Sequence, residues 1–401
     1  MMNDHDPTLQ ALAERIRAAQ ADGRALEVRG GGTKGFLGGV PRGEVLDVRA
    51  LAGISAYEPT ELVVTVRAGT PLAELEAALA ERGQGLPFEP PRFGGGGDST
   101  NSHDSSDRSG TNGAANGGTV GGMVAAGLAG PARAAVGSVR DYVLGATMLD
   151  GRGQLLSFGG QVMKNVAGYD VSRLLAGSMG VLGVICEVSL KVLPQPVARA
   201  TLRFACDQGE ALRRLNAWGG QPLPLNASAW RDGVLHLRLA GARAAVEAAV
   251  RQLGGEVVDA DQADAFWTGL RDQTDAWFMQ ARSRVEAGAT LWRLSLPQVA
   301  PPLALPGELL VEWGGAQRWL LGDAPAAQMH AAAAAAEHIH SAAAAAAAGG
   351  HANAFRVRDR AALDGGTAAP LAEPLARIHR QLKQVFDPDG LFNRGRLIPG
   401  L

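Results

Sequence analysis

The stretch RGGGTKGFLGG, residues 29–39, has the residue types and spacing to bind a phosphate group. Gly30, Gly32 and Gly35 satisfy the pattern G-x-G-x-x-G, which in dinucleotide-binding domains leads into a helix whose amino terminus holds a pyrophosphate. Here the next residues are FLGGVP, whose glycines and proline oppose a helix. The segment also lacks the spacing and the Lys-Ser/Thr ending of a nucleoside-triphosphate loop. We therefore exclude both a nicotinamide fingerprint and a triphosphate loop.

Consecutive glycines allow another chemistry, because on a turn between two strands they can direct several backbone N–H groups at one anion. A single glycine-rich loop is equally consistent with a turn that binds no ligand. However, two further glycine clusters occur at residues 117–122 and 177–183, and each adjoins an expected strand or helix end. Three such segments can line a long ligand with a central pyrophosphate, and FAD is such a ligand.

The elements around these clusters are both strands and helices. A helix is predicted from Asp6 to Gly23, short strands in ALEVRG and VLDV, and a strand in ELVVTVR followed by a helix that ends at Gly83. TVGGMVAAGLAGP predicts a short helix or a tight turn. The Asp-Gly pair at Asp150 predicts a hairpin, and residues 164–183 form a helix-sized segment before the strand VICEVSLKVLP.

Composition changes mark the remaining organisation. Residues 94–118 consist largely of Gly, Ser, Asn, Asp and Thr, so we expect a flexible surface insertion there. After Pro194 and Pro196 the patterns follow a β-α-β-β-α order, which is typical of an α+β domain of the split βαβ type. The alanine tract at residues 331–348 favours a helix, and the tail contains one more helix.

Charge and cysteine content exclude several classes of function. Lys plus Arg number 38 and Asp plus Glu 40, so the formal net charge of −2 gives no basis for binding nucleic acid or an anionic membrane. Cys186 and Cys206 are too few for an iron–sulfur cluster, a zinc site or a disulfide framework. The amino terminus lacks a signal-peptide layout, and no apolar run is long enough to span a bilayer. We expect a cytoplasmic protein that reaches the inner membrane only through partners.

Motifs in a fixed order along the chain carry a resemblance to a known family. KNVAGYDVSRLLAGSMGVLGV resembles the KN-x-x-GYD … L-x-x-GS-x-G-x-LG-V segment of the FAD-linked oxidases related to vanillyl-alcohol oxidase. More narrowly, RGGGTKGFLGG, YEPTELVVTVRAGTPL, LPFEPP, GGMVAAGLAGP, GSVRDYVLG and FGGQVMKNVAGYD resemble the FAD-binding subunits of bacterial glycolate oxidases. The resemblance runs from about residue 26 to residue 194, apart from the insertion. It resumes at GELLVEWGGAQRWL, GGHA and LKQVFDPDGLFNRGRL.

The resemblance implies an α+β fold, in which an α+β cap domain is inserted into a two-part FAD-binding domain of the vanillyl-alcohol oxidase (PCMH) type. The FAD-binding domain would comprise residues 1–195, the cap residues 196–370, and the returning segment residues 371–401. The family also implies an oxidoreductase complex that converts glycolate to glyoxylate, with a larger flavin-bearing catalytic subunit and an iron–sulfur subunit. FAD would be bound non-covalently, because relatives that tether it use a histidine or cysteine in the first glycine loop, and residues 29–39 contain neither.

The resemblance also assigns individual residues to FAD. The pyrophosphate would lie at Arg29, Gly30, Gly31, Gly32, Thr33, Lys34 and Gly35, and the second phosphate-side segment at Thr119, Gly121 and Gly122. The positions beside the central strands would be Ser138, Arg140 and Asp141. The ribityl and adenine side would be Gly177, Ser178, Gly180, Gly183 and Val184, and the isoalloxazine side Lys164, Asn165, Tyr169 and Asp170. A cation at Lys164 would stabilise the anionic reduced flavin, although an isolated lysine is more often a solvated surface residue.

The sequence departs from the family in ways that leave the role of this chain open. Related 2-hydroxy-acid dehydrogenases carry an H-G-D-G-N-x-H motif, which is absent, and His338 and His340 would point apart on a helix, so we predict no metal site. Arg394 stands where the family has proline. The sequence does not identify the cation that would hold a substrate carboxylate. Two alternatives stay open: a free-standing FAD-dependent 2-hydroxy-acid dehydrogenase, and a flavin-free structural partner.

Overall fold

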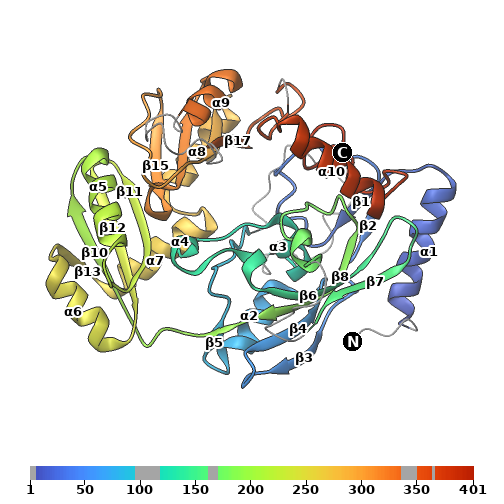
Figure 1. Cartoon of the computed structure of the whole chain (residues 1–401), viewed down its shortest axis with the longest axis horizontal. Helices are drawn as coiled ribbons and strands as arrows, with labels where there is room; N and C mark the ends of the chain where they lie inside the picture. Colours follow the sequence, from blue (N-terminus) through green and yellow to red (C-terminus); the bar gives the residue numbers. More distant parts are fainter. Residues whose placement is uncertain (1–5, 95–117, 161–169, 336–349, 364–365) are drawn as a thin grey trace. The chain divides into compact units, whose positions relative to one another are not determined.

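The chain divides into two compact units (Figure 1). The computed structural model describes residues 6–94, 118–160, 170–335, 350–363 and 366–401. Unit 1 comprises Met1–Leu128, Ser138–Gln195 and Pro370–Leu401. Unit 2 comprises Ala129–Gly137 and Pro196–Ala369. The short segment Ala129–Gly137 therefore belongs to unit 2, whereas the sequence analysis assigned it to the amino-terminal domain. The expected insertion falls almost entirely in residues 95–117, outside the described residues.

Unit 1 is built on a five-stranded antiparallel sheet in the order β3-β4-β8-β6-β7. Its strands are β3 (Ile54–Glu58), β4 (Val63–Arg67), β8 (Val184–Lys191), β6 (Val143–Leu149) and β7 (Leu155–Gly159). Two small pairs accompany it: parallel β1 (Leu26–Arg29) with β2 (Glu44–Asp47), and antiparallel β5 (Gln84–Gly85) with β9 (Leu193–Pro194). Its helices are α1 (Pro7–Ala21), α2 (Leu72–Ala80), α3 (Val120–Ala126) and α10 (Glu373–Phe386).

Most of the elements predicted for unit 1 are confirmed. They include the first helix, the strands on either side of the first glycine loop, and the hairpin of β6 and β7 around Asp150. The expected helix at residues 164–183 is different. Within the described part, residues 170–183, the backbone forms only the short 3-10 helix Ser172–Leu175 before glycines with positive φ at Gly177 and Gly180. Glycines favour such left-handed conformations and oppose a continuous helix.

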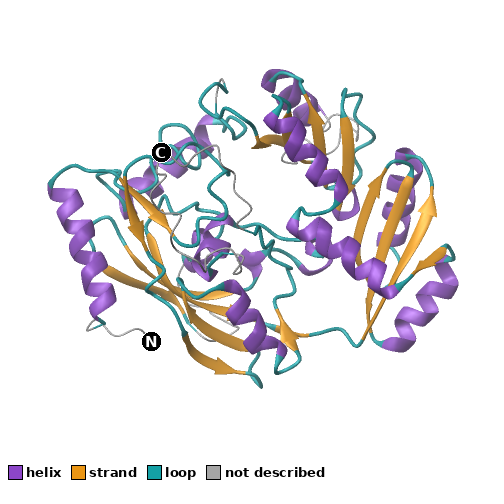
Figure 2. Ribbon diagram, turned by 180° about the vertical axis from the view of Figure 1, so that it is seen from behind, coloured by secondary structure: helices purple, strands orange, loops and turns teal. Residues whose placement is uncertain are grey.

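One hydrophobic core joins the two ends of the chain within unit 1. Five residues of α1, including Leu12 and Ile16, pack against the strands β1, β2, β6 and β8. Leu391 and Phe392, which follow α10, lie in the same core and are fully buried. Figure 2 shows α1 running along the strands of this unit. The carboxyl-terminal segment is therefore part of the structure that holds the first strand.

Cys186 lies in the middle of this core, on β8. Complete burial raises the pKa of its thiol to about 12. A thiolate is the reactive form of cysteine, so this side chain serves packing and has no nucleophilic or metal-binding role.

Asp6 fixes the start of α1 as its N-terminal cap. Its carboxylate accepts hydrogen bonds from Thr8 N (2.8 Å) and Leu9 N (3.3 Å), and it pairs with Arg67 of β4. Replacing Asp6 with alanine is expected to lower the free energy of unfolding by about 1–2 kcal/mol, because a helix cap and an ion pair are both lost. Urea denaturation measures this, and Asp6→Asn is the matched control because asparagine also caps helices.

The same interactions give the stability a pH dependence. Burial would raise the pKa of Asp6, but the two amide hydrogen bonds and the charge of Arg67 hold it below its ordinary value of 3.8. The contribution of Asp6 is therefore fully present above about pH 4 and is lost as the pH falls through the lowered pKa. Asp6→Asn should remove this part of the acid sensitivity. An unchanged acid transition in Asp6→Asn would contradict the assignment.

Unit 2 contains an eight-stranded antiparallel sheet in the order β13-β10-β12-β11-β15-β16-β14-β17. Its first four strands alternate with helices as expected for a split βαβ domain: β10 (Ala198–Ala205), α5 (Gln208–Gly219), β11 (Leu225–Arg231), β12 (Val234–Gly241), α6 (Arg243–Leu253) and β13 (Glu256–Val258). The rest of the sheet consists of β14 (Thr290–Ser295), β15 (Glu308–Glu312), β16 (Gln317–Gly322) and β17 (His351–Arg356). Further helices are α4 (Arg133–Val136), α7 (Ala260–Asp272), α8 (Ala276–Glu286) and α9 (Ala326–Ala335).

The two faces of this sheet are covered by different helices. On one face, α5 and α6 pack on leucines of β10 and β12, and α9 packs on Trp292 and Leu294. On the other face, Trp267 of α7 donates from Nε1 to Thr201 Oγ1 (2.9 Å), and Phe278 of α8 contacts Trp319. The alanine tract begins in α9, as predicted, and continues into residues 336–349, outside the described range.

Candidate flavin site

The first two glycine clusters lie against each other in unit 1. The first loop follows β1, and the second cluster runs into the first turn of α3. A Cβ added to Gly31 would lie 2.9 Å from the Cα of Gly118, and one added to Gly118 would lie 2.8 Å from Thr33 Oγ1. A Cβ on Gly30 would meet Thr119 Oγ1 more closely still. These glycines are needed because the two backbones approach too closely for side chains.

The first loop presents unused hydrogen-bond donors. The backbone N–H groups of Gly31, Gly32 and Thr33 donate to no acceptor among the residues that the structure describes. Gly32 has a left-handed conformation, with φ of 69°. Consecutive N–H groups around a left-handed residue form a concave nest that fits an anion such as a phosphate. Arg29 and Lys34 flank these donors, so the loop also carries two cations.

Several backbone donors of the second and third clusters are used within the protein. Val120 N and Gly121 N donate to carbonyls of Thr70 (2.9 Å) and Ala68 (2.7 Å). Gly177 N and Met179 N donate to carbonyls of α3, those of Val124 (2.9 Å) and Ala125 (2.8 Å). A Cβ on Gly127, which ends α3, would lie 2.7 Å from the Cα of Gly177. The helix α3 thus joins the second cluster to the third, and the first loop keeps three consecutive N–H groups, those of Gly31, Gly32 and Thr33, available for a phosphate.

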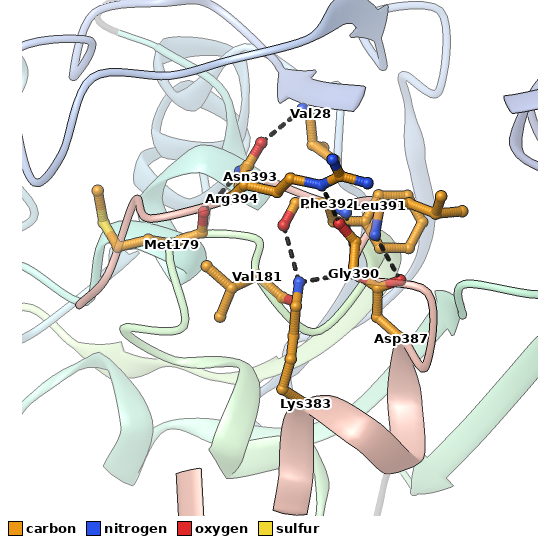
Figure 3. Close-up of polar contacts among 10 residues, drawn as sticks. All are labelled: Val28, Met179, Val181, Lys383, Asp387, Gly390, Leu391, Phe392, Asn393 and Arg394. Carbon is orange, nitrogen blue, oxygen red and sulfur yellow. Dashed lines mark hydrogen bonds and ion pairs between the residues drawn. The ribbon is translucent and has the colours of Figure 1, made fainter. Parts of the chain in front are cut away.

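The carboxyl-terminal segment connects the first and third clusters through Asn393 (Figure 3). Asn393 Oδ1 accepts from Val28 N of β1 (2.8 Å), and its Nδ2 donates to the carbonyl of Met179 (2.6 Å). Arg396 extends the connection, because its guanidinium donates to the carbonyls of Gly39 (3.2 Å) and Lys34 (3.0 Å). We call the three residues Lys383, Asn393 and Arg396 the carboxyl-terminal clamp.

Lys383 anchors this clamp from the last turn of α10. Figure 3 shows its ammonium group between the carbonyl oxygens of Val181 (2.7 Å) and Phe392 (2.8 Å) and the carboxylate of Asp387 (2.6 Å). Asp387 also accepts from Leu391 N and Phe392 N, each at 2.8 Å. Burial lowers the pKa of Lys383, and its bond to Asp387 opposes that shift. Every atom of this buried ion pair that needs a partner has one.

Arg394 does not disturb the clamp. Its side chain lies at the surface and donates from Nε to the carbonyl of Gly390, while the neighbouring Asn393 keeps both of its hydrogen bonds. Asn393 itself has φ of 45°, a conformation that asparagine tolerates. The arginine in place of the family's proline is therefore compatible with this loop.

The other residues that the resemblance assigns to the flavin site lie in different parts of unit 1. Ser138 N and Oγ donate to Asp141 Oδ2 (2.8 and 3.0 Å) and cap a short 3-10 helix, while Arg140 is exposed. Burial would raise the pKa of Asp141, but these hydrogen bonds and nearby arginines hold it below its usual value. Asp170 pairs with Arg173 at 2.8 Å.

Two more residues that were expected to line the flavin site pack within the sheet of unit 1. A Cβ on Gly183 would collide with β6, and the Val184 side chain is fully buried in the core with α1. Ser178 Oγ accepts from Gly180 N at 3.3 Å, so it stabilises the turn of the third cluster. The expected residues Lys164, Asn165 and Tyr169 lie outside the described residues.

Sequence reasoning missed the clamp. Its signal was present in KQVFDPDGLFNRGR, where Lys383 and Asp387 are four residues apart and thus on one face of a helix end. A lysine at that spacing is normally read as a surface ion pair, and burial cannot be read from spacing alone. In the part of the chain that the structure describes, no group of three His, Cys, Asp or Glu side chains could hold a metal ion, and no helix is long and apolar enough to cross a membrane.

Comparisons with known proteins agree with this architecture. A family model described as an FAD binding domain matches residues 8–103. The glycolate oxidase subunit GlcE of Escherichia coli strain K12 is 46% identical over 388 residues, which cover 97% of each chain. The D-lactate dehydrogenase of Anaerostipes hadrus is 31% identical over 170 residues, 41% of this chain and 31% of the relative.

A solved structure shows the fold across nearly the whole chain. An alkyldihydroxyacetonephosphate synthase superposes with a TM-score of 0.58 at 12% identity, covering 96% of this chain and 74% of the other. The predicted fold class, an α+β protein with an FAD-binding domain of the vanillyl-alcohol oxidase type, is thereby confirmed. The chain belongs to the family of the glycolate oxidase subunit GlcE, within the FAD-linked oxidases.

Proposed function

We propose that this chain binds FAD non-covalently in unit 1, with the pyrophosphate at the first glycine loop. The observation that supports this most is the set of unused N–H groups at Gly31, Gly32 and Thr33, flanked by Arg29 and Lys34. An anion held by such donors requires no side-chain rearrangement. Thr119, Gly121, Gly177 and their neighbours would then position this loop and line the ligand from the other side.

We also propose the other FAD contacts that the resemblance to the glycolate oxidase subunits implies. Residues on the flavin side would be Lys164, Asn165, Tyr169 and Asp170, and those near the strands Ser138, Arg140 and Asp141. Bound FAD would supply a two-electron acceptor that can be reoxidised in one-electron steps. The chain's own contribution is to hold the cofactor and, through a cation such as Lys164, to favour its anionic reduced form.

We further propose that the chain works in a glycolate oxidase complex that converts glycolate to glyoxylate. Two relatives are named as subunits of glycolate oxidase, GlcE and GlcD, which supports a multi-subunit assembly. The partners would be a larger flavin-bearing catalytic subunit and an iron–sulfur subunit, in the cytoplasm or at the inner membrane through those partners. The two cysteines are too few to hold an iron–sulfur cluster, and Cys186 is buried, so electrons would leave through clusters held by a partner.

A substitution at Gly31 tests the proposed pyrophosphate site. Gly31→Ala places a methyl group 2.9 Å from the Cα of Gly118, so one of the two backbones must move and the N–H nest is distorted. We expect at least a tenfold loss of FAD affinity, which corresponds to about 1.4 kcal/mol. Equilibrium titration of the apoprotein with FAD, followed by flavin fluorescence, measures it.

The matched control is Gly85→Ala. Gly85 also lies in unit 1, but an added Cβ there meets only Gln195 side-chain atoms at 3.9 Å. Its FAD affinity should equal that of the natural protein. Equal affinities of Gly31→Ala and the natural protein would contradict the assignment of the pyrophosphate to this loop.

Counting flavin in the assembled complex tests the proposed function. The complex with the natural chain should release one more FAD per assembly on acid precipitation than the complex with Gly31→Ala. The flavin that remains would belong to the sister subunit. If both complexes release the same amount of FAD, this chain does not carry a flavin, and the scaffold alternative holds.

A further inference from the structure

A cluster of hydrogen-bond donors lies on the β14–β17 edge of the sheet in unit 2. Arg293 and Ser295 of β14 are paired in register with Asn353 and His351 of β17. Side chains of cross-strand partners point to the same face, and their Cβ atoms lie about 4.5–5.5 Å apart. The alternating residues, such as Trp292 and Leu294, face the core under α9. We call the four polar residues Arg293, Ser295, His351 and Asn353 the edge cluster.

Arg293 is the charge at the centre of this cluster. Its Nε is buried and has no hydrogen-bond partner, and no carboxylate among the described residues pairs with its guanidinium. Its Cζ lies 5.6 Å from the centroid of the Phe355 ring, so one side of the group is covered by an aromatic face. Burial, and then the charge of Arg133, lower the pKa of Arg293 to about 10, which leaves it protonated at neutral pH.

Two acidic residues of β15 lie on the same sheet face, and neither compensates this charge. Glu308 is paired with Arg284 of α8 at 2.5 Å. Glu312 of β15 lies beyond β16 and accepts hydrogen bonds from Trp319 Nε1 (2.5 Å) and Gln317 Nε2 (3.0 Å). Arg133, whose Cζ lies 4.8 Å from the Trp313 ring centroid, adds positive potential at Arg293. A buried guanidinium that pairs with no carboxylate is unfavourable unless an anion joins it.

The neighbours of Arg293 are suited to complete an anion site. Asn353 Oδ1 accepts from Ala369 N (2.9 Å), and this bond turns the amide nitrogen away as a donor. Burial and the charge of Arg293 lower the pKa of His351, so its imidazole is neutral at pH 7 and can donate one N–H. A guanidinium holds a carboxylate with two parallel hydrogen bonds, a geometry that lysine cannot provide.

We propose that the edge cluster binds the carboxylate of a small organic acid, with Arg293 as the bidentate partner and Asn353 and His351 as additional donors. This inference rests on the proposed function, since the acid class that fits the chain is the 2-hydroxy acids and their 2-oxo products. Phe355 and Trp319, whose ring centroids are 4.7 Å apart, give the site an apolar side that favours a small organic acid over a hydrated inorganic ion. We assign the edge cluster to binding the acid only, with His351 as a hydrogen-bond donor.

Calorimetric titration of the flavin-loaded full chain with glycolate, and separately with glyoxylate, tests this site. The natural chain should bind at least one of the two acids, and Arg293→Gln should bind it at least tenfold more weakly. Arg203→Gln is the matched control, because Arg203 lies on the same sheet but is exposed and paired with Glu256 at 2.6 Å. The control should bind like the natural chain.

Asn353→Asp provides a second test, in which Arg293 is kept and a carboxylate is added beside it. The new carboxylate would lie opposite Arg293 and occupy the site itself, so the variant should bind no acid and melt at a higher temperature than the natural chain. Absence of acid binding to a natural chain that carries its FAD would overturn the inference and leave the proposed function intact. Equal affinity for inorganic phosphate, or unchanged binding in Arg293→Gln, would also overturn it.

Discussion

Replacing Lys383 with methionine is expected to lower the free energy of unfolding by about 3–5 kcal/mol, the largest stability effect of any single substitution considered for unit 1. The Asp387 carboxylate is fully buried, and without the ammonium group it would keep only its two backbone donors, Leu391 N and Phe392 N. Two carbonyl oxygens, those of Val181 and Phe392, would lose a donor as well. Urea denaturation followed by circular dichroism measures the change.

Arg380→Met is the matched control for this prediction. Arg380 is on the same helix and pairs with Glu373, but the two side chains are 53% and 75% exposed. Exposed ion pairs contribute about 0–1 kcal/mol, so the control should be nearly neutral. Similar losses in the two variants would show that Lys383 is no more than a surface residue. The double variant Lys383→Met, Asp387→Leu should recover part of the lost stability, because no unpaired charge remains.

Replacing Asn393 with alanine is expected to weaken FAD binding about 5- to 150-fold. The substitution removes the two hydrogen bonds that hold β1 and the third glycine cluster to the same side chain. The loss of such buried partners corresponds to about 1–3 kcal/mol. Asn393 touches both segments without being assigned to the ligand, so it is a positioning residue. The measurement is the FAD dissociation constant together with the melting temperature of the apoprotein.

Gln84→Ala is the matched control, which separates the positioning of the FAD site from a general loss of stability. Gln84 is also a buried amide in unit 1 and makes two comparable hydrogen bonds, to Tyr57 Oη (2.8 Å) and to the carbonyl of Pro59 (2.8 Å), but it is bonded to none of the glycine clusters. Both variants should melt at similarly reduced temperatures, and only Asn393→Ala should lose FAD affinity. Equal losses of FAD affinity in the two variants would show that Asn393 affects FAD binding only through the overall stability of unit 1.

Local patterns were sufficient for much of the fold. The run of β-branched residues in ELVVTVR, the Asp-Gly turn at Asp150 and the capping Asp6 each specify an element through contacts only a few residues apart. Such local signals are read directly from the chain. The family resemblance supplied the fold class, which the comparisons confirm.

Other features depend on contacts distant in sequence, which local patterns do not encode. The assignment of Ala129–Gly137 to unit 2 reflects, in part, the hydrogen bond from Trp313 Nε1 to the carbonyl of Gly130 (3.0 Å), between residues 183 positions apart. The burial of Lys383 likewise depends on Val181, 202 positions away. Glycine counts could not distinguish the unused N–H groups of the first loop from the N–H groups of the second and third clusters that donate to carbonyls within unit 1.

The central claim is that this chain itself holds FAD without a covalent bond, and the visible absorption spectrum of the purified full chain tests it most directly. The account predicts flavin bands that survive gel filtration, bleach with dithionite and pass entirely into the supernatant after acid precipitation. A chain that shows no flavin bands, even after incubation with added FAD and gel filtration, would contradict it.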